Sequence, residues 1–211
     1  MIIAVDGPTA SGKGTIARAL AAHFGLPHLD TGLLYRAVGR QVALAGGDPD
    51  KAEDALAGCK FDEELLDDLE LRSETFGGLA SRVSIHPQVR AALLERQHAF
   101  ARQPGGAVLD GRDIGTVIAP EADAKLFVTA SLQARAARRF AEMRARGEAV
   151  IEADIAADLS RRDQRDATRS TAPLRQADDA MVLDTSELDP AEAIGAAIAL
   201  VERRLGRAPA R

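Results

Sequence analysis

The chain is poor in cysteine and has no long apolar run. Its 211 residues include one cysteine, Cys59, which excludes a disulfide framework and a cysteine-rich metal site and is usual in a reducing compartment. No apolar run approaches the roughly 20 residues needed to cross a bilayer. The first expected strand begins at Met1 and leads straight into a glycine-rich loop, leaving no room for a signal peptide. We therefore expect a cytoplasmic protein.

Lysine and net positive charge are also scarce. Four lysines stand against 23 arginines, and the formal charge is -5 at pH 7. This acidic average argues against a general polyanion-binding surface, although local arginine clusters can still bind small phosphates. With 46% hydrophobic residues, the chain is long enough to bury the core of one sizeable domain. We expect a single domain over residues 1–211 that binds neither a nucleic-acid polymer nor a membrane.

The most informative motif follows the apolar run 1–6 and precedes a helix-like stretch. It consists of Gly7, Pro8, Thr9, Ala10, Ser11, Gly12, Lys13, Gly14 and Thr15. Glycines let such a loop turn its backbone N–H groups toward a phosphate, the next helix adds its positive end, and the lysine reaches the β- and γ-phosphates. A glycine-rich turn can join any strand to any helix, but here the spacing, the lysine and the context coincide. The motif predicts an ATP-type phosphate site.

One position departs from the usual phosphate loop. Gly14 stands where a serine or threonine normally holds Mg²⁺, and the hydroxyl comes one residue later, on Thr15. We therefore expect no direct protein ligand to Mg²⁺, which would be held through waters with Asp110 and Thr15 nearby. Asp110 ends an apolar strand, where phosphate-loop enzymes place the carboxylate that orients the metal. Asp110-Gly111 is also ordinary turn chemistry, and the phosphate loop favours the catalytic interpretation.

Short apolar runs alternate with longer amphipathic ones. They predict strands at 2–6, 28–30, 107–110, 125–129 and 181–184, and helices at 14–24, 31–45, 87–102, 131–146, 151–166 and 190–205. This alternation predicts an α/β fold with a five-stranded parallel sheet, helices on both faces and ligands beyond the carboxyl ends of the strands. Residues 47–80 break the pattern, and we expect a short helix or irregular insertion there, with the acidic run 62–70 in solvent. The tail from Arg207 to Arg211 is expected to fray.

A second group of charged residues lies at 161–169. Arg162, Asp166 and Arg169 recur at spacings of four and three, so they share one face if the helix continues, with Arg165 on its flank. Such residues can form ordinary surface ion pairs. Here, however, the arginines outnumber the aspartates, and guanidinium groups suit phosphate oxygens. We therefore expect a phosphate-binding lid over residues 147–173.

The motifs, taken in order, resemble those of bacterial cytidylate kinases. The specific blocks are Asp30-Thr31-Gly32 with Tyr35-Arg36 and the run Asp110-Gly111-Arg112-Asp113-Ile114-Gly115-Thr116. The resemblance extends from Met1 to about Leu205. It implies the P-loop nucleoside-monophosphate-kinase fold and ATP-dependent phosphorylation of CMP and dCMP by direct in-line transfer, with Mg²⁺. Small kinases that open and close commonly work alone, so we also expect a monomer.

The resemblance further implies which residues bind the acceptor nucleoside. Ser81, Arg90 and Asp113 would face the cytosine. The exocyclic amine of cytosine suits a carboxylate acceptor and its ring acceptors suit an arginine, whereas uracil reverses part of this pattern. Arg162 and Asp166 would hold the ribose hydroxyls.

Phosphate binding is assigned by the same resemblance. Three arginines would neutralise the monophosphate: Arg36, Arg112 and Arg169. Arg165 is placed nearer the ATP phosphates. The expected catalytic set is Lys13, Asp110, Arg112, Arg165 and Arg169. The acceptor pocket would also include Thr31 and Tyr35.

The chain departs from this family between Arg36 and Ser81. Most relatives carry a longer insertion with extra strands there, and this chain has the acidic run 62–70 instead. Closure over CMP and the preference between ribose and deoxyribose acceptors are expected to depend on this segment. Two alternatives stay open: another small P-loop kinase of the adenylate or shikimate type, and a nucleotide-binding module that has lost catalysis.

Overall fold

The computed structural model describes residues 1–206, and these contain a parallel β-sheet of five strands. The strands are β1 (Ile2–Asp6), β2 (His28–Asp30), β3 (Ala107–Gly111), β4 (Ala124–Thr129) and β5 (Met181–Asp184). Their order across the sheet is β2-β3-β1-β4-β5, so β1 lies between two strands that come much later in the chain. The predicted strands are confirmed, with boundaries that differ by one residue at most.

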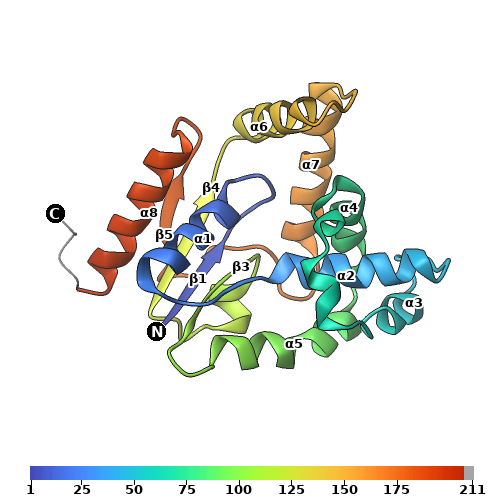
Figure 1. Ribbon diagram of the computed structural model, residues 1–211, viewed down its shortest axis with the longest axis horizontal. Coiled ribbons are helices and arrows are strands. Elements are labelled where there is room, and N and C mark those ends of the chain that lie inside the picture. The colour runs from blue at the N-terminus through green and yellow to red at the C-terminus, as the bar shows by residue number, and fades with distance from the viewer. Residues whose placement is uncertain (207–211) are drawn as a thin grey trace.

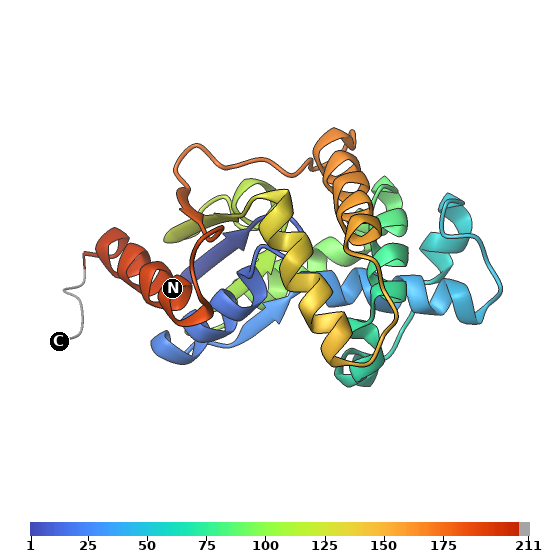
Figure 2. The ribbon, with the colours of Figure 1, turned by 90° about the horizontal axis from the view of Figure 1, so that it is seen from above.

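Helices cover both faces of this sheet. The longer ones are α1 (Lys13–Phe24), α2 (Thr31–Leu44), α5 (Pro87–Ala101), α6 (Leu132–Ala145), α7 (Glu152–Thr168) and α8 (Pro190–Arg204). Helix α8 lies at one end of the molecule and α2 at the other, while α6 and α7 lie beyond the sheet (Figure 1). Seen from above, α7 runs beside α4 (Glu74–Val83) (Figure 2). The predicted helices are confirmed to within about two residues at each end.

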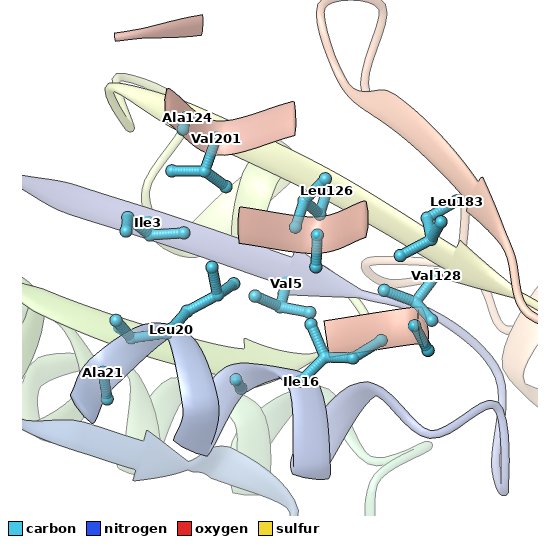
Figure 3. Close-up of a cluster of buried hydrophobic side chains, with 14 residues drawn as sticks. Ile3, Val5, Ile16, Leu20, Ala21, Ala124, Leu126, Val128, Leu183 and Val201 are labelled. Atoms are coloured by element: carbon cyan, nitrogen blue, oxygen red, sulfur yellow. The ribbon is translucent and has the colours of Figure 1, made fainter. Parts of the chain in front are cut away.

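The core explains why the strands are so apolar. Alternate residues of β1 enter different clusters: Ile3 and Val5 pack with α1 and α8, whereas Ala4 packs with Leu109 on the opposite face. Figure 3 shows Ile16 of α1 directed toward Val5. Because both faces are covered, most interior strand positions are apolar; Lys125 of β4 is an exception, and its ammonium is paired with Asp179.

Residues 47–80 contain more regular structure than the sequence predicted. They form α3 (Ala52–Ala57), the 3₁₀ turns η1 (Glu63–Asp67) and η2 (Leu69–Arg72), and most of α4 (Glu74–Val83). Helix α4 packs along α2 so closely that a Cβ on Gly39 would lie 2.6 Å from the Cβ of Leu79. The acidic run is mostly exposed, as expected, and Asp68 in it pairs with Arg40.

The carboxyl ends of the strands lie along one edge of the sheet. The chain leaves β1 through residues 7–12, leaves β2 directly into α2, and leaves β3 through Arg112, Asp113 and a π-helical turn, η3 (Ile114–Ile118). The expected fray from Arg207 to Arg211 lies outside the described residues. Within residues 1–206, no helix is both long and apolar enough to traverse a bilayer.

Candidate functional site

The loop of residues 7–12 is tightly fitted to the sheet. A Cβ on Gly7 would lie 2.0 Å from the carbonyl oxygen of Val128, so only glycine fits beside β4. Ala10 and Gly12 both adopt positive φ, 62° and 87°, and such curvature turns successive N–H groups toward the concave side of a loop. Gly12 has no side chain to cap α1, which leaves the first N–H groups of that helix for an anion. The loop has the form of a phosphate cradle.

Lys13 begins α1 and extends back along the loop. Its Nζ lies 3.5 Å from the carbonyl oxygen of Pro8. Burial and the nearby Arg112 guanidinium together lower the pKa of Lys13 to about 8, although the charges of Asp110 and Asp30 act in the opposite direction. A further anionic group near this ammonium, such as a phosphate, would therefore stabilise its charged form.

Asp110, at the end of β3, lies next to the phosphate loop. One of its oxygens, Oδ1, lies 2.7 Å from Nε2 of His28 on the neighbouring strand β2. The other, Oδ2, would lie 3.8 Å from a Cβ on Gly14. A side chain on residue 14 would thus contact the carboxylate, so glycine keeps the space between Asp110 and the first turn of α1 open.

These carboxylates fit a magnesium ion that arrives with a nucleotide. No cluster of three or more His, Cys, Asp or Glu side chains in residues 1–206 could hold a metal by itself. Mg²⁺ commonly uses one or two carboxylates together with phosphate oxygens and waters. The charges of Asp110 and Asp30 both raise the pKa of Lys13. Burial and the Asp110 charge raise the pKa of Asp30, and a bound cation would lower that pKa again.

A single cleft brings nearly all of the predicted site residues together. Its volume is about 620 Å³. The predicted residues that line it are Thr9, Ala10, Ser11, Gly12, Lys13, Gly14, Thr15, Thr31, Tyr35, Arg36, Ser81, Arg90, Asp110, Arg112, Asp113, Arg162, Asp166 and Arg169. Gly7, Pro8 and Arg165 are not among its lining residues. The phosphate loop and residues 161–169, here called the arginine segment, therefore face one another across the same cleft.

Asp113 forms a buried charged cluster opposite the phosphate loop. Its Oδ2 pairs with Nη2 of Arg90 in α5, and its Oδ1 lies 3.5 Å from Nη2 of Arg169. The Arg90 guanidinium also lies 5.5 Å from the centre of the Tyr35 ring. A planar aromatic group, a carboxylate and a guanidinium thus occur together in a small part of the cleft, which suits a flat heterocycle with both donors and acceptors.

Arg112 links this cluster to the phosphate loop. Its Nε donates to Oδ2 of Asp166 at 2.7 Å, and its Nη2 donates to Oγ1 of Thr9 at 2.6 Å. Asp166 belongs to α7, so the pair joins the loop that follows β3 to α7 across 54 residues. Helix α7 ends at Thr168, and Arg169 follows it in extended conformation. The expected continuous helix face therefore stops before Arg169, although Arg169 still lines the cleft.

Helix α4 brings an acidic residue into the arginine cluster. Oε2 of Glu74 lies 3.0 Å from Nη2 of Arg162, and its Oε1 pairs with Arg139 of α6. Gly77, one turn later, leaves room for two guanidiniums: a Cβ there would lie 3.0 Å from Nη2 of Arg36 and 3.1 Å from Nη1 of Arg162. The segment 47–80 thus contributes directly to the cleft.

Two predicted arginines contact other groups in this conformation. Nη1 of Arg36 donates to the carbonyl oxygens of Leu71 and Ser73, each at 2.7 Å. Nε of Arg165 donates to Oγ of Ser81, which lines the cleft, at 3.1 Å. A role for Arg165 at the ATP phosphates stays a prediction.

Several residues of the site were not predicted from the sequence. Glu74 of α4 and Arg139 of α6 are 65 residues apart in the sequence and meet only in the folded protein. Arg135 of α6 donates to the carbonyl oxygen of Thr9 at 3.2 Å and pairs with Asp163 at 2.7 Å. His28, which the sequence analysis does not single out, contacts Asp110. No local signal in the sequence singles out His28, because it is the first residue of β2 and ligand sites are expected at the carboxyl ends of strands.

Comparison with known proteins gives consistent results. A family model described as cytidylate kinase matches residues 3–203. A protein named cytidylate kinase from Xanthobacter autotrophicus is 59% identical over 208 residues, which cover 98% of this chain and 100% of that protein. One from Rhodopseudomonas palustris strain TIE-1 is 56% identical over 209 residues, covering 98% and 99%. The crystal structure of an uncharacterized protein from Eubacterium ventriosum shares the fold, with a TM-score of 0.56 at 14% identity over 96% of this chain and 98% of that one.

Proposed function

Because the chain belongs to the cytidylate kinase family, we propose that it transfers the γ-phosphoryl group of ATP to CMP and dCMP. The chain is a phosphotransferase of nucleotide metabolism. The bond that forms joins an oxygen of the acceptor monophosphate to the γ-phosphorus, and the bond that breaks releases ADP. The products are ADP and CDP or dCDP.

The buried pair of Arg90 and Asp113 is the feature that most favours cytosine as the acceptor base. A carboxylate accepts from the exocyclic amine of cytosine, and the guanidinium donates to ring acceptors. Ser81 supplies a hydroxyl on the same side of the cleft, and Tyr35 supplies an aromatic surface. Uracil has a carbonyl where cytosine has the amine, so it would place an acceptor against Asp113.

Acceptor sugar and phosphate would be held by the surrounding charges. Arg162 and Asp166 suit the ribose hydroxyls, whereas Arg36, Arg112 and Arg169 would neutralise the monophosphate. An ionised phosphate needs no general base, because its oxygen is already a nucleophile at neutral pH. Catalysis then requires that oxygen to be positioned in line with the γ-phosphorus, together with stabilisation of the charge on the transferring group.

ATP would occupy the phosphate cradle formed by residues 7–15. Lys13 stabilises the charge that develops on the transferring and leaving oxygens. Mg²⁺ bound with ATP neutralises the β- and γ-phosphates, and Asp110 and Thr15 would hold its water ligands rather than the ion itself. The hydroxyl of Thr15 lies one residue after the usual position for a Mg²⁺ ligand, which is consistent with this arrangement because Gly14 has no side chain that could bind the ion.

The remaining assignments form part of the same proposal. Residues 1–211 act as one kinase domain, residues 47–80 as its shortened acceptor-side insertion, and residues 147–173 as a lid. We further propose that the enzyme is a monomer and works in the cytoplasm. Ion pairs such as Glu74 with Arg162, which join the insertion to α7, support movement of these segments as coupled units.

A coupled ADP-release assay with ATP and Mg²⁺ tests the proposal. The acceptors are CMP, dCMP, UMP, AMP, GMP and shikimate. We expect CMP and dCMP to give the highest kcat/KM, and a Lys13→Ala variant with an unchanged circular dichroism spectrum to lose turnover. Faster reaction with AMP or shikimate would favour another P-loop kinase. Binding of ATP without transfer to any acceptor would identify a non-catalytic module.

A further inference from the structure

The carboxylate of Asp6 is buried at the end of β1 and fastened to a distant loop. Only 5% of the residue is exposed. Its Oδ1 accepts the backbone N–H of Ile114 at 2.8 Å, and its Oδ2 accepts that of Gly115 at 2.7 Å. Both oxygens of one side chain thus bind two successive amides that lie more than 100 residues later in the chain.

These two amides belong to the first residues of η3. The first N–H groups of a helical turn have no partner within the turn, and a side chain at the preceding position usually accepts from them. Here the preceding residue is Asp113, whose side chain makes no capping hydrogen bond. Asp6 supplies the acceptors instead, so the Asp113 carboxylate is left to face the cleft.

The loop around Asp113 is consequently fixed on both sides. Gly111 pairs with Asp6 in the register of β1 and β3, and Ile114 and Gly115 bind the Asp6 side chain. Asp113 lies between these attachments and directs its oxygens to Arg90 and Arg169. A small rotation of the loop would therefore move the Asp113 carboxylate relative to both guanidiniums.

Asp6 is a costly residue to place in this position. Burial raises its pKa to about 7, even though the N–H groups of Gly115 and Ile114 act in the opposite direction. The charges of Asp113 and Arg112 contribute in opposite senses. The fit is also close, because a Cβ on Gly115 would lie 3.4 Å from Oδ2 of Asp6 and 3.1 Å from Cδ of Lys125. Among residues 1–206 no lysine or arginine is bound to this buried carboxylate, which has two backbone donors. This arrangement indicates a demand for geometry more than for stability.

We propose that Asp6 is a positioning residue for acceptor-base selection, which holds Asp113 in register with Arg90 and Arg169 through the amides of Ile114 and Gly115. The inference rests on the proposed function, in which Asp113 accepts from cytosine. Asp6 itself contacts no substrate. Its effect reaches the base only through the backbone of residues 113–115.

Asp6→Asn is the direct test, because it keeps the size of the side chain and replaces one acceptor oxygen by a donor that faces an N–H group. We expect the ratio of kcat/KM for CMP to that for UMP to fall about tenfold, the effect of one hydrogen bond to a charged acceptor. The loss should appear as a raised KM for CMP. Since Gly7 follows directly, the KM for ATP is measured in parallel.

Gly115→Ala perturbs the same contact from the other side without touching the phosphate loop, and it decides the question if Asp6→Asn does not fold. Ile118→Val is the matched control, because it removes a buried methyl group from the same turn and leaves the Asp6 hydrogen bonds in place. We expect Gly115→Ala to lower the CMP-to-UMP ratio and Ile118→Val to lower only the melting temperature.

An unchanged CMP-to-UMP ratio in the folded Asp6→Asn variant would overturn the inference, as would a raised KM for ATP alone, since Asp6 would then support only the phosphate loop. An equal loss of the ratio in Ile118→Val would also overturn it. These outcomes are distinct from failure of the proposed function, in which the unmodified protein itself would show no preference for CMP.

Discussion

Binding of ATP is expected to take up a proton at Lys13 near pH 8. Burial and Arg112 lower the pKa of this ammonium from 10.5 to about 8. With that pKa, about 90% of Lys13 is charged at pH 7 and about 10% at pH 9. ATP phosphates stabilise the charged form, so the bound state keeps the proton over this whole range. The affinity for ATP should therefore fall about tenfold between pH 7 and pH 9.

The sign follows from which state holds more protons. A group whose pKa is depressed in the unliganded protein and restored by an anion gains a proton on binding, so binding weakens as the pH rises through about 8. Phosphate groups titrate near pH 6 and are already ionised in this range. Isothermal titration calorimetry of ATP with Mg²⁺, in buffers of different ionisation enthalpy at pH 8, should report about half a proton taken up for each ATP bound.

Lys13→Arg is the matched control, because the guanidinium stays charged throughout this pH range. The variant is expected to bind ATP with little pH dependence, even if its affinity is lower. Equal affinity of the unmodified protein at pH 7 and pH 9, with no proton uptake at pH 8, would refute the argument that Lys13 is desolvated in the cradle. Uptake of the same size in Lys13→Arg would assign the proton to another group.

Three further outcomes are expected from glycine contacts and a helix cap. Gly39→Val should lower the free energy of unfolding by about 1–3 kcal/mol in urea titrations, because its Cβ would lie 2.6 Å from Leu79 in α4; unchanged stability would mean that α2 and α4 can separate freely. Asp189→Ala should cost about 1 kcal/mol in the same measurement, since Asp189 accepts two N–H groups at the start of α8 and completes a capping box with Glu192; an intact melting temperature would contradict this. Gly77→Ala should raise the KM for CMP several-fold and leave the KM for ATP unchanged, because the new methyl group would lie 3.0–3.1 Å from two guanidiniums; a rise in the KM for ATP instead would place this helix on the donor side.

The sheet and the phosphate loop were predictable because their signals are local. Strands buried on both faces appear as short apolar runs, and β5 was predicted with its observed boundaries, Met181–Asp184. The phosphate loop needs its residues within nine positions of one another. Its prediction therefore does not depend on how the remainder of the chain folds.

Contacts between segments that are neighbours in the sheet but distant in the sequence were not predictable in the same way. Asp6 meets Ile114 because β1 pairs with β3, its neighbour in space but not in sequence. Helix α4 was missed because Gly77 and Gly78 weaken a helical pattern and suggest a loop. The glycines are tolerated there because Gly77 faces the guanidiniums of Arg36 and Arg162, a requirement that arises only once α4 is packed.

Three arginines of the cleft are already paired with carboxylates of the protein itself. Arg112 pairs with Asp166, Arg90 with Asp113 and Arg162 with Glu74. An anion that binds to these arginines must replace their internal carboxylate partners. The free energy lost when each ion pair breaks is recovered only if the bound molecule offers several groups at once. Inorganic phosphate or sulfate, with a single anionic centre, should thus compete poorly with a complete nucleotide. The cleft can then stay open to its substrates in a solution rich in small anions.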